Sequence, residues 1–163
     1  MPSTPPMFLG GWIARLYRAG QQAMAISLHG TGIGAGQFPF LRLLARQDGL
    51  CQDTIAHALY LDKGTVARAL QKLESQNFVR RRADAADARK LLVFLTPKGR
   101  RAAVLIHRAL AAWHRVLLGG LEADEQRALR RSLEKMHANA EAWLAAPPPV
   151  RSSRSSRSRE RKA

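Results

Sequence analysis

Apolar residues recur at helical spacing along most of the chain, and two short stretches near its middle have the composition of strands. Glycines interrupt the pattern over 30–36, and Asp48-Gly49 and Gly119-Gly120 mark further breaks. The pattern predicts helices over 7–28, 37–47, 52–59, 63–76, 97–118 and 122–145, and strands over 78–82 and 90–95. We therefore expect a mainly α-helical fold with one small β-hairpin.

The two short helices over 52–59 and 63–76 are joined by a tight connection. In the second helix, Val66, Leu70 and Leu73 share one face, which predicts that this face is buried. The residues expected to face outward are Gly64, Arg68, Gln71, Lys72 and Ser75. Such a pair is typical of a helix-turn-helix, although many helical hairpins share the pattern.

The predicted hairpin follows the second short helix directly, with a polar loop over 83–89. A hairpin in this place is typical of a wing, which is suited to lie along a neighbouring groove of DNA. We therefore expect a winged helix-turn-helix domain over 36–96.

The helices outside that domain, over 7–35 and 97–146, have large apolar faces that a small winged module cannot cover. These faces include Trp12, Leu16, Leu105, Leu110, Trp113, Leu117, Leu129, Leu133, Met136 and Trp143. The sequence predicts that the two segments form a helical dimerisation region, which pairs with a second copy of the chain by two-fold symmetry.

The charge of the chain indicates what kind of molecule it binds. The 163 residues contain 27 Lys and Arg against 12 Asp and Glu, a net charge of +15. Such an excess predicts a polyanionic partner, with nucleic acid ahead of an anionic membrane surface. Residues 62–101 account for +7 of the charge on elements expected to fold. The Arg/Ser-rich tail over 147–163 and the first residues, 1–6, are expected to be disordered; the tail either attracts phosphate or is simply solvated.

Several classes of function are disfavoured. One cysteine excludes a disulfide framework, and no apolar run approaches the roughly 18 residues of a membrane span. The first residues also lack the features of a signal peptide, so we expect a cytoplasmic protein with no membrane partner. No nucleophile–base pair, phosphate loop or paired-carboxylate pattern is present, and only His107 and His114 among five histidines share a helix face. We expect no catalytic residues, no cofactor and no metal site.

The stretch from Gly36 to Gly99 resembles a MarR-family winged helix-turn-helix regulator, and the helix order extends the resemblance to about 7–145. The segments that carry it are Gln37-Phe38-Pro39-Phe40-Leu41, Gln52-Asp53-Thr54-Ile55-Ala56, Leu61 to Arg68, Leu73-Glu74, Asp87-Ala88-Arg89 and Leu95-Thr96-Pro97-Lys98-Gly99. The resemblance implies a homodimeric transcriptional regulator, with repression favoured over activation. It would bind a pseudo-palindromic operator on double-stranded DNA and be released by a small-molecule effector, commonly a small aromatic or phenolic acid or an oxidant.

The resemblance also implies that helix 63–76 enters the major groove and that Arg89 reaches the minor groove, with Asp87 bracing its guanidinium. Arg68 is suited to guanine, Thr65 to a thymine methyl group or a phosphate, and Lys63 and Lys72 to phosphates. The predicted DNA-binding residues are Lys63, Thr65, Arg68, Gln71, Lys72, Arg82, Asp87, Arg89 and Lys90. The alternative for these side chains is that they are solvated surface charges or, at the wing, form a simple salt bridge between Asp87 and Arg89. The alternative for the whole protein is an architectural DNA-binding protein with weak sequence preference.

The effector pocket is expected to involve Trp12, Arg15, His107 and Trp113, with Arg15 pairing an acid. Packing in the core or dimer is the alternative role for the aromatic residues. Cys51 stands where the family usually has Ser or Thr before the Gln that opens the third helix. We expect Cys51 to be a packed, structural thiol rather than a redox sensor.

Overall fold

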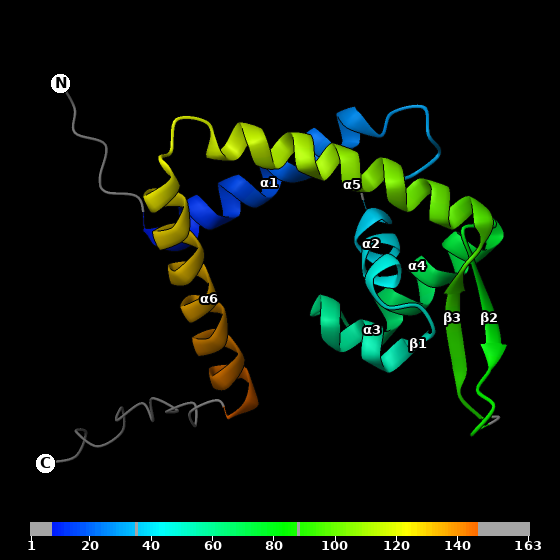
Figure 1. Ribbon diagram of the computed structural model, residues 1–163. Coiled ribbons are helices and arrows are strands. Elements are labelled where there is room, and N and C mark those ends of the chain that lie inside the picture. The colour runs from blue at the N-terminus through cyan, green and yellow to red at the C-terminus, as the bar shows by residue number, and fades with distance from the viewer. Residues whose placement is uncertain (1–7, 35, 88, 147–163) are drawn as a thin grey trace, which may run out of the picture. The chain divides into compact units, whose positions relative to one another are not determined.

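The structure is a computed structural model that describes residues 8–34, 36–87 and 89–146 (Figure 1). Its elements in chain order are α1 (Leu9–Ser27), α2 (Phe38–Arg46), β1 (Leu50–Cys51), α3 (Gln52–Leu59), α4 (Lys63–Ser75), β2 (Val79–Ala83), β3 (Leu91–Leu95), α5 (Pro97–Leu118) and α6 (Ala123–Ala145). Every predicted helix and strand is present, with ends that shift by one or two residues. The predicted disordered segments, 1–6 and 147–163, lie outside the described residues.

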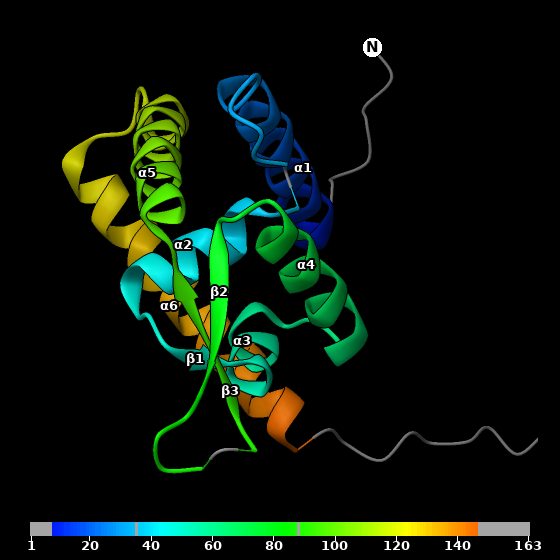
Figure 2. The same ribbon diagram turned by 90° about the vertical axis from the view of Figure 1, so that its right-hand side faces the viewer.

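The chain divides into two compact units after Leu117. In the first unit, three antiparallel strands form a sheet in the order β1-β3-β2. The β2–β3 hairpin extends past α3 and α4 of the same unit as the predicted wing (Figure 2). The strand β1 was not predicted, because two residues give no periodicity to detect; Leu50 pairs with Val93 there.

The core of the first unit lies where α2, α3 and α4 pack against the sheet. The predicted buried stripe of α4 is confirmed, since Val66, Leu70 and Leu73 are fully buried. They meet buried residues of the other elements, including Leu41, Ile55, Val79, Val93, Leu95 and Ile106. This packing fixes one face of α4 and leaves its opposite face on the surface.

The start of α5 is fastened to the end of α4. Thr96 Oγ1 accepts from the backbone N–H of Gly99 at 3.0 Å, so it caps α5 as the Thr-Pro pair predicts. The same hydroxyl donates to the carbonyl of Asn77 at 2.7 Å, and the Thr96 N–H donates to the carbonyl of Phe78 at 3.0 Å. These bonds hold the root of the hairpin against the end of α4.

The helices outside the winged domain carry exposed apolar side chains, as the sequence predicts. On α1, Trp12 is 53% exposed and Leu16 52% exposed, and α5 exposes Val104, Leu105 and Val116. The second unit contains α6, which begins with a capping box between Glu122 and Glu125 and buries none of its residues. Its exposed apolar residues are Leu129, Leu133, Trp143 and Leu144.

Candidate nucleic-acid interface and effector cavity

The N-terminus of α4 is held by the carboxylate of Asp62. Its Oδ1 accepts from the Thr65 N–H at 2.8 Å, and its Oδ2 accepts from the Thr65 hydroxyl at 2.6 Å. The Thr65 hydroxyl, and then the Thr65 backbone N–H, lower the pKa of Asp62 below its ordinary value. Arg68 Nη2 in turn donates to Thr65 Oγ1 at 3.2 Å. The first turn of α4 is therefore ordered before any partner arrives.

The predicted outward face of α4 is confirmed, because Arg68, Gln71 and Lys72 are exposed. Thr65 is half-buried, and its hydroxyl is engaged by Asp62 and Arg68. Lys63 is exposed and pairs with Asp53 of α3 at 3.0 Å. Arg68, Gln71 and Lys72 are therefore exposed and, among the described residues, carry no ion pair to a carboxylate.

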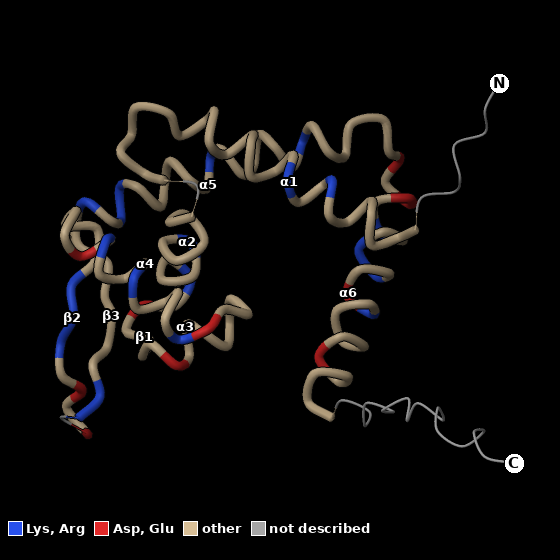
Figure 3. The backbone as a smooth tube through the Cα atoms, turned by 180° about the vertical axis from the view of Figure 1, so that it is seen from behind, with Lys and Arg blue, Asp and Glu red and all other residues tan. Residues whose placement is uncertain are grey.

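The wing continues this basic surface. Arg80 and Arg82 are exposed on β2, whereas Arg81 is half-buried and pairs with Glu74 of α4 at 3.3 Å. Figure 3 shows Lys and Arg positions following β2 toward the hairpin tip. Because side chains alternate between the two faces of a strand, Arg80 and Arg82 face outward whereas Arg81 connects the wing to α4.

At the wing tip, Asp87 does not perform the expected task. Its carboxylate accepts from the backbone N–H of Arg89 at 3.1 Å and pairs with Lys90 Nζ at 3.6 Å. Among the described residues it makes no ion pair with the Arg89 guanidinium, because the short turn places the backbone of Arg89, rather than its side-chain end, against the carboxylate. Asp87 thus shapes the turn, and Arg89 is exposed.

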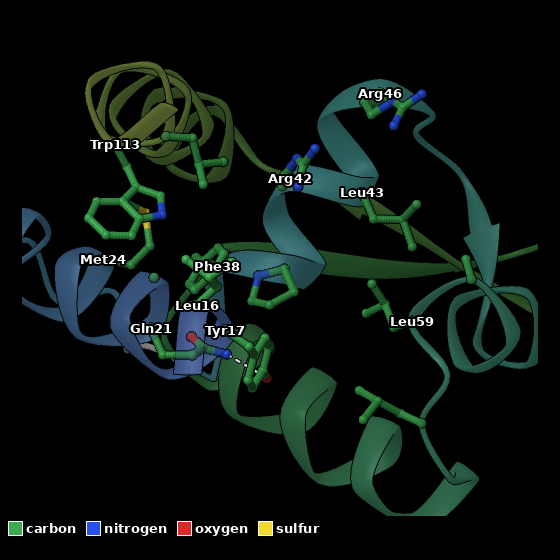
Figure 4. Close-up of a pocket in the computed structure, with 15 residues that line it drawn as sticks. Leu16, Tyr17, Gln21, Met24, Phe38, Arg42, Leu43, Arg46, Leu59 and Trp113 are labelled. Atoms are coloured by element: carbon green, nitrogen blue, oxygen red, sulfur yellow. Dashed lines mark hydrogen bonds between the residues drawn. The ribbon is translucent and has the colours of Figure 1, made fainter. Parts of the chain in front are cut away.

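The predicted effector residues do not line one pocket. A cavity of about 540 Å³ between α1, α2 and α5 includes Trp113 but neither Trp12 nor Arg15 (Figure 4). Trp12 lies one helical turn before Leu16, beyond the cavity, and Arg15 is turned about 100° from the lining face. His107 lines a second cleft on α5.

The sequence analysis did not identify the polar and charged residues that line this cavity. Arg42 and Arg46 of α2 are the cations of the cavity, and Tyr17 and Gln21 come from α1. Gln21 Nε2 donates to the Tyr17 hydroxyl at 2.7 Å, and its Oε1 is buried without a partner among the described residues. The spacing of Arg42 and Arg46, one turn apart on an otherwise apolar helix, was the available signal.

Cys51 is half-buried at the N-terminus of α3. The Thr54 hydroxyl, 3.1 Å from Sγ, lowers the pKa of the thiol, and the Thr54 backbone N–H adds to this effect.

Within the described part of the chain, no group of His, Cys, Asp and Glu is arranged to hold a metal ion. No described helix is long and apolar enough to cross a membrane.

The capped and exposed α4, the short helix before it and the basic hairpin after it define a winged helix-turn-helix protein. The model of the MarR family matches residues 33–91. The HTH-type transcriptional regulator BilQ of Clostridium symbiosum is 30% identical over 117 residues, which cover 72% of this chain and 81% of the relative. The chain belongs to the MarR family of transcriptional regulators, as its motifs suggest.

Solved structures agree with this assignment. A MarR transcriptional regulator from Methanosarcina mazei Go1 is 38% identical, with a TM-score of 0.78 over 83% of this chain and 97% of that chain. A MarR family transcriptional regulator from Listeria monocytogenes, complexed with a 26mer DNA, is 26% identical, with a TM-score of 0.79 over 85% and 93%. The family and these neighbours are regulators rather than enzymes, which confirms the prediction that the chain is not an enzyme.

Proposed function

We propose that the protein is a sequence-specific transcriptional repressor that binds a pseudo-palindromic operator as a homodimer. The observation that carries the proposal is the capped helix α4, which exposes three long cationic or amide-bearing side chains: Arg68, Gln71 and Lys72. Arginine and glutamine can each make two hydrogen bonds to a base edge in the major groove. The Listeria monocytogenes neighbour complexed with DNA supports this reading.

The wing supplies a second contact in this proposal. Arg89 is exposed beside a turn that Asp87 holds in shape, and a narrow minor groove attracts an inserted arginine through its concentrated negative potential. Arg82 and Lys90 are exposed near it and lie where phosphates would pass. Lys63 and Lys72 would neutralise phosphates at the two ends of α4.

The dimer would be built from 7–35 and 97–146. Support comes from the exposed apolar side chains of α1 and α5 in the first unit and of α6 in the second. A patch of this kind on a soluble regulator is best explained by a second copy of the chain. Two-fold symmetry would then present two α4 helices to half-sites about one turn, or 34 Å, apart.

The effector would occupy the cavity between α1, α2 and α5. Its walls are mostly apolar, with Trp113, Phe38 and Tyr17 available to contact a ring and Arg42 to pair an acid group. Because α2 also packs against the helix-turn-helix, a ligand here can favour a geometry in which the two α4 helices are wrongly spaced. A coupling free energy of about 1–3 kcal/mol would weaken DNA binding by roughly 5–150-fold.

The test compares arginines inside and outside the interface. Arg68→Ala and Arg89→Ala should each weaken operator binding by roughly 1–3 kcal/mol, with Arg68→Ala also relaxing the preference for one base. Arg108→Ala, an exposed arginine on α5, is the matched control and should leave affinity unchanged. Fluorescence anisotropy with a labelled duplex measures the affinities, and circular dichroism checks the fold. Normal affinity in both interface variants would remove α4 and the wing from the mechanism.

A further inference from the structure

The side chain of Arg68 is held against the first turn of α4 by its neighbours. Asp62 Oδ2 accepts from the Thr65 hydroxyl at 2.6 Å, and the oxygen of that hydroxyl accepts from Arg68 Nη2 at 3.2 Å. A Cβ added to Gly64 would lie 3.2 Å from Asp62 Oδ1 and 3.5 Å from Arg68 Nη1. The carboxylate and the guanidinium therefore both lie over the Cα of Gly64, where a side chain would meet them.

The Thr65 hydroxyl links these two charged groups. Within the described chain, Asp62 and Arg68 form no direct ion pair. A hydroxyl has one proton to donate and lone pairs that accept. Because Thr65 donates its proton to the carboxylate, its lone pairs are left to accept from the guanidinium. Lys63 does not compete for Asp62, since it pairs with Asp53 at 3.0 Å.

The charge of Asp62 also makes the start of α4 a favourable place for an arginine. The N-terminus of a helix carries a partial positive charge, which repels a guanidinium that reaches back to the first turn. The Thr65 hydroxyl, then the Thr65 N–H and, more weakly, Arg68 lower the pKa of Asp62, so its carboxylate is ionised at neutral pH. The ionised carboxylate keeps Arg68 at the end of α4 that, in a recognition helix, meets base edges.

The bond to Thr65 leaves Arg68 able to bind a base. A guanidinium carries five N–H donors, and one of them is used here. Guanine presents two acceptors in the major groove, O6 and N7, and a bidentate arginine discriminates against other bases by roughly 5–150-fold. A freely rotating side chain must first be immobilised, which costs about 2–12-fold in affinity. Since Thr65 already fixes the guanidinium, part of this cost is removed.

We propose that Asp62 and Thr65 are positioning residues that hold Arg68 for one guanine of the operator, and that the Thr65 hydroxyl acts through Arg68 rather than on the DNA. The inference rests on the proposed function, because it requires α4 to read the major groove. Asp62 and Arg68 are exposed, and polar contacts on such a surface contribute little to stability. They strengthen where bound DNA excludes water. The Thr65 hydroxyl should therefore affect base preference far more than the stability of the fold.

The experiment uses the full chain and a duplex that the unsubstituted protein selects from a random library. Each base pair of that duplex is replaced in turn, and fluorescence anisotropy measures the affinities. Comparison with Arg68→Ala identifies the base pair whose preference depends on Arg68, and we expect guanine there. Thr65→Val removes the hydroxyl but keeps the branched side chain. Asp62→Asn keeps a residue that caps helices but loses the charge.

Thr65→Val and Asp62→Asn should each reduce the preference for that base pair by roughly 2–12-fold, because Arg68 is then immobilised only on binding. Neither substitution should reduce the affinity further when Arg68 is already alanine. Thr65→Ser, which restores the hydroxyl, should keep the preference. Glu134→Gln, at an exposed position of α6, removes one carboxylate elsewhere and is the matched control. It should bind like the unsubstituted chain.

Two results would overturn this inference while leaving α4 in the interface. The first is an unchanged base preference in Thr65→Val and Asp62→Asn, with circular dichroism showing that both are folded. The second is an equal loss of affinity from Thr65→Val when Arg68 is alanine, which would show that the hydroxyl contacts DNA itself. If Arg68→Ala altered no base preference, the proposed reading of the major groove by α4 would fail as well.

Discussion

Replacing Gly99 by alanine tests how the winged domain is joined to α5. Alanine in a helix normally stabilises a protein relative to glycine by about 0.5–1 kcal/mol, and Gly99 lies in the first turn of α5. Here a Cβ would lie 2.0 Å from the carbonyl oxygen of Phe78 and 3.1 Å from Leu95 Cδ2. The first of these contacts is with backbone, so the neighbour cannot rotate away.

The geometry gives the size of the effect. The start of α5 must move by about 1 Å to restore van der Waals contact, and this shift strains the bonds from Thr96 to Asn77 and Phe78. Each such bond contributes about 0.5–1.5 kcal/mol, and overpacking costs about 1–3 kcal/mol. After the gain in helix propensity, we expect Gly99→Ala to lower the free energy of unfolding by about 1–4 kcal/mol.

Urea denaturation at one fixed protein concentration measures this change, because a dimer would make stability depend on concentration. Gly10→Ala is the matched control: Gly10 also lies in the first turn of a helix, and its added Cβ meets only the Phe8 ring, at 3.7 Å. That variant should be as stable as the unsubstituted chain or slightly more so. If Gly99→Ala behaved like Gly10→Ala, the close approach of α5 to Phe78 would be refuted.

Two further predictions concern charge. The fold lowers the pKa of Asp62 below its ordinary value of 3.8. The ionised carboxylate therefore stabilises the folded state at pH values above 3.8, and this contribution is lost as the pH falls through the pKa of the folded state. The stability difference between the unsubstituted chain and Asp62→Asn should therefore shrink on acidification in denaturation curves; a constant difference would contradict the assignment. Deleting residues 150–163 should reduce the salt dependence of DNA binding while leaving site preference intact. Equal salt slopes would show that the tail does not touch DNA.

The helices and the hairpin were predictable because their signals are local. The stripe of Val66, Leu70 and Leu73 determines which face of α4 is buried, and Thr96-Pro97 marks the start of α5. The structure also explains the residue types of the Leu-Thr-x-Lys-Gly motif over 95–99. Thr96 caps the helix, Lys98 Nζ donates to the carbonyl of Gln76 at 2.8 Å, and Gly99 permits the contact with Phe78.

The cavity was less predictable, since its lining depends on how three helices are placed in space. Aromatic residues and an arginine on one helix do not reveal which turn of that helix faces a neighbour. Arg15 and Arg42 are alike in sequence terms, yet packing of α2 against α1 and α5 brings only Arg42 to the cavity. The contact that Asp87 makes was missed for a related reason. Whether its carboxylate meets the backbone N–H of Arg89 or the guanidinium depends on the local geometry of the turn, which the sequence does not reveal.

The most direct test of the central claim is binding of the purified protein to the DNA upstream of its own coding sequence, against a shuffled duplex of equal composition. Near about 150 mM salt, a sequence-specific regulator should bind the native fragment about a thousandfold more tightly than the shuffled one. Equal affinity for the two duplexes would contradict sequence-specific regulation and favour an architectural DNA-binding protein, whose affinity comes from its positive charge alone.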